Sequence, residues 1–181
     1  SSLFNVISVN SYTKEIFNKR LPFSVLQKPF SVLNTYLKFK SFFKPANNNF
    51  FFELGVSDTS YDQFIPVKEV FAKIGPLESI PDNSVYLKMD IEQSEYDILE
   101  DVLTYSSKIN GMAIEFHDLR HFWSDFTFLM DKIRGEYEIV HIHGNNCCGY
   151  IPNTELPNFI ELSLIKRSLL GNDELTTKND K

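Results

Sequence analysis

The chain has 181 residues, of which 43% are apolar and 14% aromatic, and its formal net charge is −6 at pH 7. This length suits one domain with a real hydrophobic core, and the composition is that of a globular protein rather than a disordered one. The negative charge argues against a general nucleic-acid binder, because such proteins neutralise phosphates with an excess of Lys and Arg.

The first quarter of the chain predicts a strand over 3–10 (LFNVISVN) and a helix over 12–21, then one or two further helices broken near Pro29. The segment 14–44 carries seven Lys or Arg residues against the single acid Glu15, interleaved with Phe. Such a segment suits peripheral contact with a membrane or an anionic ligand. A pair of amphipathic helices with a solvated Lys face is the simpler interpretation.

The rest of the chain alternates strands with helices. Strands are expected over 50–58, 84–92, 111–118, 137–145 and 158–167, and helices over 65–75 (between Pro66 and Gly75), 94–107 (capped by Ser94) and 122–135. This alternation predicts an α/β fold with a mostly parallel, helix-covered sheet.

The last two strands lack a helix between them, so we expect them to be antiparallel neighbours joined by a loop over 146–158. An α/β sheet that ends in such a pair is typical of the methyltransferase version of the Rossmann arrangement. We expect one domain over 1–168, with a helical insertion at about 14–46, and a flexible tail over 169–181.

Acidic side chains follow the strand expected over 84–92. The stretch VYLKMDIEQSEYDIL places Asp90 and Glu92 directly after an apolar run, with Glu95 three residues later. Ligands of doubly wound sheets bind outside the carboxyl ends of the strands, so acids at this point indicate a functional site. Helix capping or a first-turn position explains Glu95 and Asp97, but not Asp90 and Glu92, because burying an unpaired carboxylate is costly.

Two later strand ends repeat the pattern. AIEFHD places Glu115 and His117 two residues apart, and IVHIHGNN does the same with His141 and His143. Side chains two apart on a strand share one face of the sheet, so we expect a rim of carboxylates and imidazoles. Taken singly, His141 and His143 are equally well explained as core or edge residues, and His121 is expected at the surface or at a helix start.

The two cysteines, Cys147 and Cys148, are adjacent, and adjacent cysteines rarely form a disulfide. The pair therefore implies no disulfide framework, which suits a reducing compartment. The sequence shows no signal-peptide pattern, and no apolar stretch reaches the ~20 residues that span a bilayer. We expect a cytoplasmic protein.

These motifs resemble a known family. LKMDIEQSEYDIL is similar to the LKxDIEGxExxxL signature of FkbM-type S-adenosylmethionine-dependent methyltransferases and their methyltransferase-like relatives. IEFHDL, HIHGNN and PNFIELSLI resemble later strands of that family, in the same order and at similar spacing, so the resemblance covers 85–167. It implies a Rossmann-like methyltransferase sheet, S-adenosyl-L-methionine as cofactor, and O-methyl transfer to a sugar or other small hydroxyl acceptor. The residues that match the family's motifs are Asp90, Glu92, Glu95, Glu115, His117, His143 and Asn145.

The chain departs from the family inside its best motif, where Gln93 replaces the usual Gly. Glycine would allow a tight turn with positive φ at this position, which Gln adopts only at a cost. The shape of the ligand pocket is therefore expected to differ from the family's.

The start of the fold departs as well. Such folds open with a strand and a glycine-rich turn that wraps the cofactor, followed by a second strand that ends in an acid for the ribose. The alignment that fits best makes 3–10 the second strand and 50–58 the third, so the first strand and its turn are missing from this sequence. Asn10 then takes the place of the ribose acid, and Asp58 lies near the adenine. A sheet without its first strand is expected to have an exposed gap.

Methyl transfer is an in-line displacement that is helped by positioning and by removal of the acceptor's proton. A base with a pKa near the operating pH suits this role, which makes His117 and His143 the candidates. Glu115 or Glu92 would orient the ring or bind acceptor hydroxyls. Cofactor contacts are expected from Asn10, Asp58, Asp90, Glu92 and Glu95.

Two alternatives stay open. His141 and His143, with Asp90, Glu92, Glu115 and His117, offer nitrogen and oxygen ligands for a divalent ion, although the H-x-H pattern is short and common, so no metal is expected. The second alternative is that the chain is a truncated or diverged methyltransferase-like module that has no activity and binds a glycan or a protein partner. The missing glycine turn, Asn10 and Gln93 favour the second alternative.

Overall fold

The computed structural model describes residues 7–8, 37–38, 41, 50–51, 54–62 and 64–171. Several expectations therefore lie outside the described residues: most of the strand over 3–10, Asn10, the tail after 171, and the basic segment 14–44 apart from Leu37, Lys38 and Ser41. In the described part of the chain, no helix is long and apolar enough to cross a membrane.

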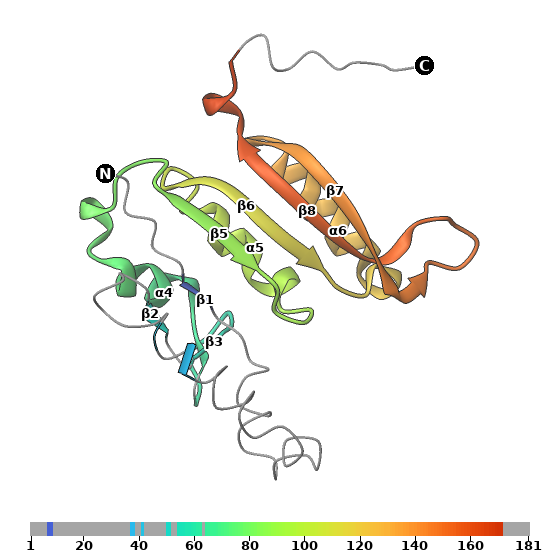
Figure 1. The fold of residues 1–181 in the computed structure, drawn as a ribbon, viewed down its shortest axis with the longest axis horizontal. Coiled ribbons are helices and arrows are strands. Elements are labelled where there is room, and N and C mark those ends of the chain that lie inside the picture. The colour runs from blue at the N-terminus through green and yellow to red at the C-terminus, as the bar shows by residue number, and fades with distance from the viewer. Residues whose placement is uncertain are drawn as a thin grey trace.

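The main sheet of the described chain has four strands in the order β5-β6-β8-β7 (Figure 1). These are β5 (Val85–Met89), β6 (Ile109–Phe116), β8 (Pro157–Lys166) and β7 (Tyr137–Tyr150). β5 and β6 are parallel, whereas β8 lies between β6 and β7 and is antiparallel to both. The α/β class and the antiparallel closing pair are thus confirmed. The described sheet is mixed rather than mostly parallel, because only β5 and β6 pair in parallel, and β7 extends five residues beyond the expected strand end at 145.

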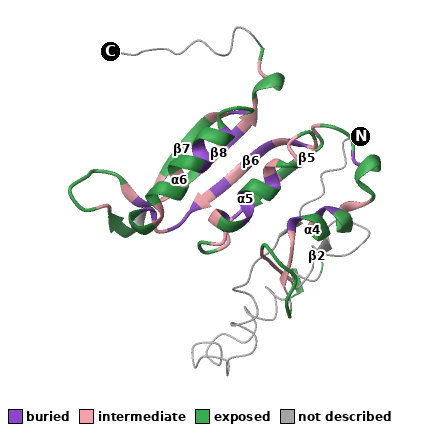
Figure 2. Ribbon diagram, turned by 180° about the vertical axis from the view of Figure 1, so that it is seen from behind, coloured by how far each residue is buried: buried purple, intermediate pink, exposed green. Residues whose placement is uncertain are grey.

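Two helices, α5 (Glu95–Leu103) and α6 (Leu119–Ile133), cover one face of this sheet (Figure 2). Both connect strands that advance in the same direction across the sheet, and right-handed crossovers then place both helices on the same side. The core lies between these helices and the sheet. Its side chains that are at most 1% exposed are Leu99, Ile109, Met112, Ile114, Phe116, Leu119, Ile133, Tyr137 and Leu164.

The strands that precede this sheet are short. β1 (Ile7–Ser8) pairs in parallel with β2 (Phe50–Phe51), and β3 (Gly55–Val56) with β4 (Phe64–Ile65). The strand expected over 50–58 is therefore divided into two pieces.

Helix α4 (Val67–Ile74) begins after Pro66 and ends at Gly75, as the sequence predicts. It contacts α5 beside the outer edge of β5, and the described residues pair β5 on its β6 side only. An apolar pocket follows this outer edge, lined by Val67, Phe71, Leu87, Met89, Ile98 and Val102 among others. Short 3-10 turns at Leu77–Ser79 and Arg167–Leu169 complete the described elements.

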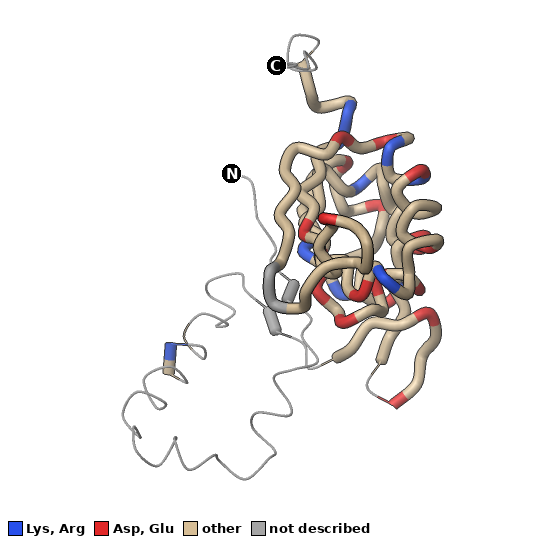
Figure 3. The backbone as a smooth tube through the Cα atoms, turned by 90° about the vertical axis from the view of Figure 1, so that its right-hand side faces the viewer, with Lys and Arg blue, Asp and Glu red and all other residues tan. Residues whose placement is uncertain are grey.

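Two helix starts differ from the expectation. Ser94 occupies the N-cap position of α5, as predicted, but it has a helical backbone conformation and its side chain makes no capping hydrogen bond. α6 begins at Leu119 rather than at Phe122, which keeps a non-helical conformation inside the helix. Figure 3 shows acidic and basic residues interspersed around the described α/β part, as on an ordinary solvated surface.

Candidate functional site

The polar residues of two neighbouring strands converge where β5 and β6 end. Asp90 and Glu92 follow β5, Glu115 is the penultimate residue of β6, and His117 comes directly after it. One ligand atom from each of Asp90, Glu115 and His117 lies within 4.8 Å of the other two. The rim predicted from the spacing of these residues is therefore formed at these two strand ends.

A buried carboxylate–imidazole pair, Glu95 and His117, lies at the base of this cluster. Glu95, the first residue of α5, has an exposed fraction of 0%, and His117 is 3% exposed. Oε1 of Glu95 accepts a hydrogen bond from the backbone N–H of His117 at 2.7 Å and lies 2.9 Å from its Nδ1. Because an ionised carboxylate only accepts, the proton of the imidazole is held at Nδ1. Glu95 is thus neither a simple capping residue nor a solvated first-turn acid.

This pairing turns the other imidazole nitrogen toward the rim. Nε2 of His117 lies 3.6 Å from Oδ1 of Asp90 and 3.7 Å from Oε2 of Glu92. Burial lowers the pKa of His117, but the hydrogen bond to Glu95 and the nearby carboxylates of Glu95, Glu92 and Glu115 outweigh it and raise the pKa above its ordinary value. The Asp90 and Glu92 side chains are 38% and 57% exposed, so the cluster has a buried base and an accessible mouth.

Two aromatic residues that the sequence did not single out hold His117 in place. The hydroxyl of Tyr96 donates to the backbone carbonyl of His117 at 2.7 Å, and burial raises the pKa of this phenol. The ring of Phe159 meets the imidazole edge-on, with 5.0 Å between ring centroids. The sequence could have suggested them only through their neighbours, because Tyr96 follows Glu95 and Phe159 lies in the motif PNFIELSLI.

The turn between β5 and α5 is strained. Glu92 and Gln93 have φ values of +55° and +81°, so two consecutive residues adopt the left-handed conformation. The other non-glycine residues with positive φ in the described part of the chain are Asn or Asp, which tolerate it better. Gln93 therefore keeps the backbone conformation that the family's Gly would favour. The turn brings the carboxylate of Glu92 to His117, and strain of this kind collects at functional sites.

Glu115 is hydrogen-bonded to a residue of β7, the edge strand of the sheet. Nδ2 of Asn145, on β7, donates to Oε1 of Glu115 at 3.1 Å, reaching across β8. Glu161 on β8 is paired with Glu115 on one side and with His143 on the other. His143 is therefore two strands away from Glu115, about 10 Å at the usual spacing between strands. Asn145 thus joins the cluster through Glu115.

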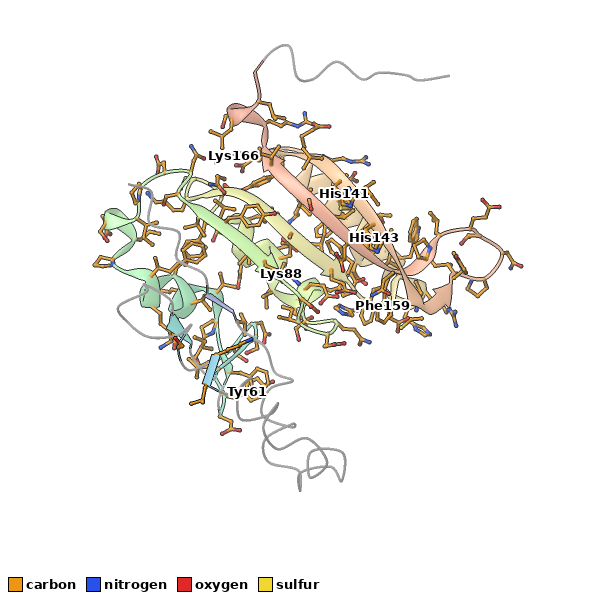
Figure 4. The ribbon with its side chains drawn as sticks, in the orientation of Figure 1. Tyr61, Lys88, His141, His143, Phe159 and Lys166 are labelled. Atoms are coloured by element: carbon orange, nitrogen blue, oxygen red, sulfur yellow. The ribbon has the colours of Figure 1, made fainter. Side chains whose placement is uncertain are left out.

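The histidines of β7 are solvent-exposed. His141 pairs with Ser163 and His143 with Glu161 on β8, and Figure 4 shows both histidines along β7, with Phe159 on β8 and Lys88 on β5. His143 therefore belongs to the outer part of the rim rather than to its buried base.

Two further predicted residues lie elsewhere. Asp58 is exposed in the turn after β3, where its Oδ1 accepts from Thr59 Oγ1 at 3.3 Å. His121 is exposed near the start of α6, with Nδ1 2.8 Å from Oδ2 of Asp118, in agreement with its expected surface position.

No family model, curated protein or solved structure matches this chain. The FkbM-type resemblance therefore rests on the motifs themselves.

The arrangement suits a cationic ligand at the mouth of the cluster. Asp90 and Glu92 present carboxylates to solvent, whereas Glu95 is enclosed and reaches a ligand only through His117. An imidazole whose proton is fixed at Nδ1 offers an unprotonated Nε2, the form that accepts a proton or coordinates a metal.

Proposed function

We propose that the chain is an S-adenosylmethionine-dependent O-methyltransferase that acts on a sugar or another small hydroxyl-bearing acceptor. One observation carries the proposal: the acids of the LKMDIEQSE motif and the Glu115–His117 pair meet at the carboxyl ends of two parallel strands. In α/β sheets this is the edge at which ligands bind. The antiparallel closing pair of strands supports the same proposal.

The residues present fit the charge of the cofactor. S-adenosylmethionine bears a sulfonium and an ammonium group, and the partly exposed carboxylates of Asp90 and Glu92 offer complementary charge. When bound, it supplies an electrophilic methyl group. We assign Asp90 and Glu92 to ligand contact, and we reassign Glu95 from cofactor contact to positioning because its carboxylate is buried against His117.

His117 is the candidate general base. Glu95 holds its proton at Nδ1, so Nε2 takes the proton of an acceptor hydroxyl placed at the rim, and the resulting imidazolium is stabilised by Glu95 and Glu92. Because the pKa of His117 is raised, this role requires a pH above that pKa. Glu115, held by Asn145, is placed to bind acceptor hydroxyls.

A second candidate function is a methyltransferase-like module that binds a glycan or a protein without catalysis. The observation that favours it is the enclosure of His117, whose side chain is 4% exposed and therefore offers an acceptor little access.

Calorimetric titration of the full chain with S-adenosylmethionine separates the two candidates. The enzyme proposal expects saturable binding that weakens at least about tenfold in Asp90→Asn, which corresponds to losing one charge-assisted contact. Asp97→Asn is the matched control, because it makes the same change at an exposed position of α5. Folded protein that binds no cofactor, or equal binding by all three proteins, would overturn the assignment of this site to the methyl donor.

A further inference from the structure

The distances in the cluster are those of ligands around an ion. Nε2 of His117 lies 3.6 Å from Asp90 Oδ1, too far for a hydrogen bond. Two ligand atoms that share one ion, at bond lengths of about 2.1 Å and angles of about 110–120°, are themselves about 3.5 Å apart. The ligand atoms of Asp90, Glu115 and His117 lie within 4.8 Å of one another, so a small inward movement of the partly exposed Asp90 side chain brings all three within bonding distance of one ion.

The contact of Glu95 with Nδ1 of His117 favours metal coordination by the other imidazole nitrogen, Nε2. Metal-bound histidines usually donate their second N–H to a carboxylate, which fixes the tautomer and orients the ring. Glu95 makes this contact with Nδ1 at 2.9 Å, and its side chain, at the first position of α5, is fully buried. The nitrogen left for a ligand is the one that faces Asp90.

The charge at the base of the cluster is incompletely compensated. Oε2 of Glu95 is buried and has no hydrogen-bond partner among the described residues. Buried carboxylate oxygens in this situation are destabilising unless a cation or a donor offsets them. The nearby cation Lys88 lies 3.7 Å from Asp90, but its side chain is 69% exposed, so its contribution is weak.

We propose that Asp90, Glu115 and His117 form a binding site for one divalent transition-metal ion, with Glu95 as the positioning residue behind the imidazole. One nitrogen and two carboxylates suit Zn²⁺ or Mn²⁺ better than Ca²⁺ or Mg²⁺, which prefer oxygen ligands alone. Three protein ligands with an accessible mouth leave a coordination position for water or for a hydroxyl-bearing ligand. This inference does not require methyl transfer, so it stands or falls separately from the proposed function.

The test is calorimetric titration with ZnCl₂ of full-length protein that has been stripped with a chelator and purified without a histidine tag. The visible spectrum of the Co²⁺-loaded protein gives a second readout. We expect one ion per chain. Loss of a residue that hydrogen-bonds to a metal ligand typically lowers metal affinity by roughly 10–100-fold, and we expect a loss in this range for Glu95→Gln. Asp90→Asn and Glu115→Gln remove ligands themselves, so each should lower the affinity by more than this.

Two controls locate the ion. Glu161→Gln removes an exposed carboxylate directly opposite Glu115 on β8 and should leave the affinity within about twofold of wild type. His143→Gln should also bind normally, because His143 lies on the exposed outer strand. Thermal unfolding of each variant without metal shows that it is folded.

Binding that survives in Asp90→Asn and Glu115→Gln but is lost in His143→Gln would assign the metal to the His141–His143 pair and overturn the proposal. Absence of binding to folded wild-type protein would also overturn it, and the cluster would then be an ion pair between His117 and its acids. Neither result depends on S-adenosylmethionine, so a failure here is distinguishable from a failure of the proposed function.

Discussion

The strained turn before α5 gives a sharp test, because its cost can be worked out from one dihedral angle. Gln93 has a φ of +81°, and its side chain is exposed, so replacing it with Gly removes backbone strain without removing buried contacts. A non-glycine residue in the left-handed region costs about 1–2 kcal/mol. Glycine also increases the conformational entropy of the unfolded chain, which lowers the free energy of unfolding by about 0.4–1 kcal/mol.

Gln93→Gly should therefore raise the free energy of unfolding by about 0.5–1 kcal/mol. For a domain of this size each kcal/mol shifts the melting temperature by about 2–4 °C, so the expected increase is about 1–4 °C. Urea unfolding followed by circular dichroism measures the free energy directly. Ligand affinity should not change, because the Gln93 side chain is exposed and takes no part in the hydrogen bonds and ion pairs described for the cluster.

Gln93→Ala is the matched control, since it shortens the side chain but keeps the strain. Its free energy of unfolding should equal that of the wild type or be slightly lower. A Gln93→Gly variant that is less stable than Gln93→Ala would mean that the turn is not left-handed at this residue. The placement of Glu92 beside His117 would then lose its support.

Three other changes have defined outcomes. Glu95→Ala should lower the free energy of unfolding by about 3 kcal/mol in urea titrations because it leaves the buried His117 without its partner, whereas the exposed Glu100→Ala should have little effect. Leu99→Ala, at a position with 0% exposure, should cost about 3 kcal/mol by opening a cavity under α5, and thermal unfolding should show it. The hydrogen bond and charge of Lys108, 2.7 Å away, lower the pKa of Asp82, so this carboxylate adds stability above its unfolded pKa and loses it as the pH falls through its folded pKa. Asp82→Asn should thus be less stable than wild type at pH 7, and the two unfolding curves should converge in acid; a difference that persists at low pH would contradict this assignment.

The gathering of acids and histidines at the strand ends could be predicted from the sequence because it follows from local rules. Apolar runs mark β5 and β6, and parallel strands joined by a helix bring their carboxyl ends to one edge. Asp90, Glu92, Glu115 and His117 are therefore brought together by chain order alone. The same rule predicted the antiparallel closing pair from the missing helix between the last two strands.

Details that depend on tertiary contact could not be predicted. The SEYD sequence is an ordinary helix start, and only the packing of α5 on β6 shows that Glu95 is buried against His117. Gln93 was expected to avoid positive φ, yet the short connection from β5 to α5 imposes it. The length of β7 past residue 145, and the shifts in its register with β8 after Ile139 and after Asn145, depend on the pairing of the two strands, which local sequence does not reveal.

The most direct test of the central claim is ¹⁵N NMR of the imidazole rings in histidine-labelled protein, with the His117 signals assigned by comparison with His117→Gln. If Glu95 holds Nδ1–H while Nε2 faces the rim, this proton should exchange with water far more slowly than the ring protons of His121 or His143. The protection should disappear in Glu95→Gln, and the Nε2 resonance should move when a ligand is added. A His117 ring that exchanges as fast as the exposed histidines, and does not respond to Glu95→Gln, would contradict the assembly of this site.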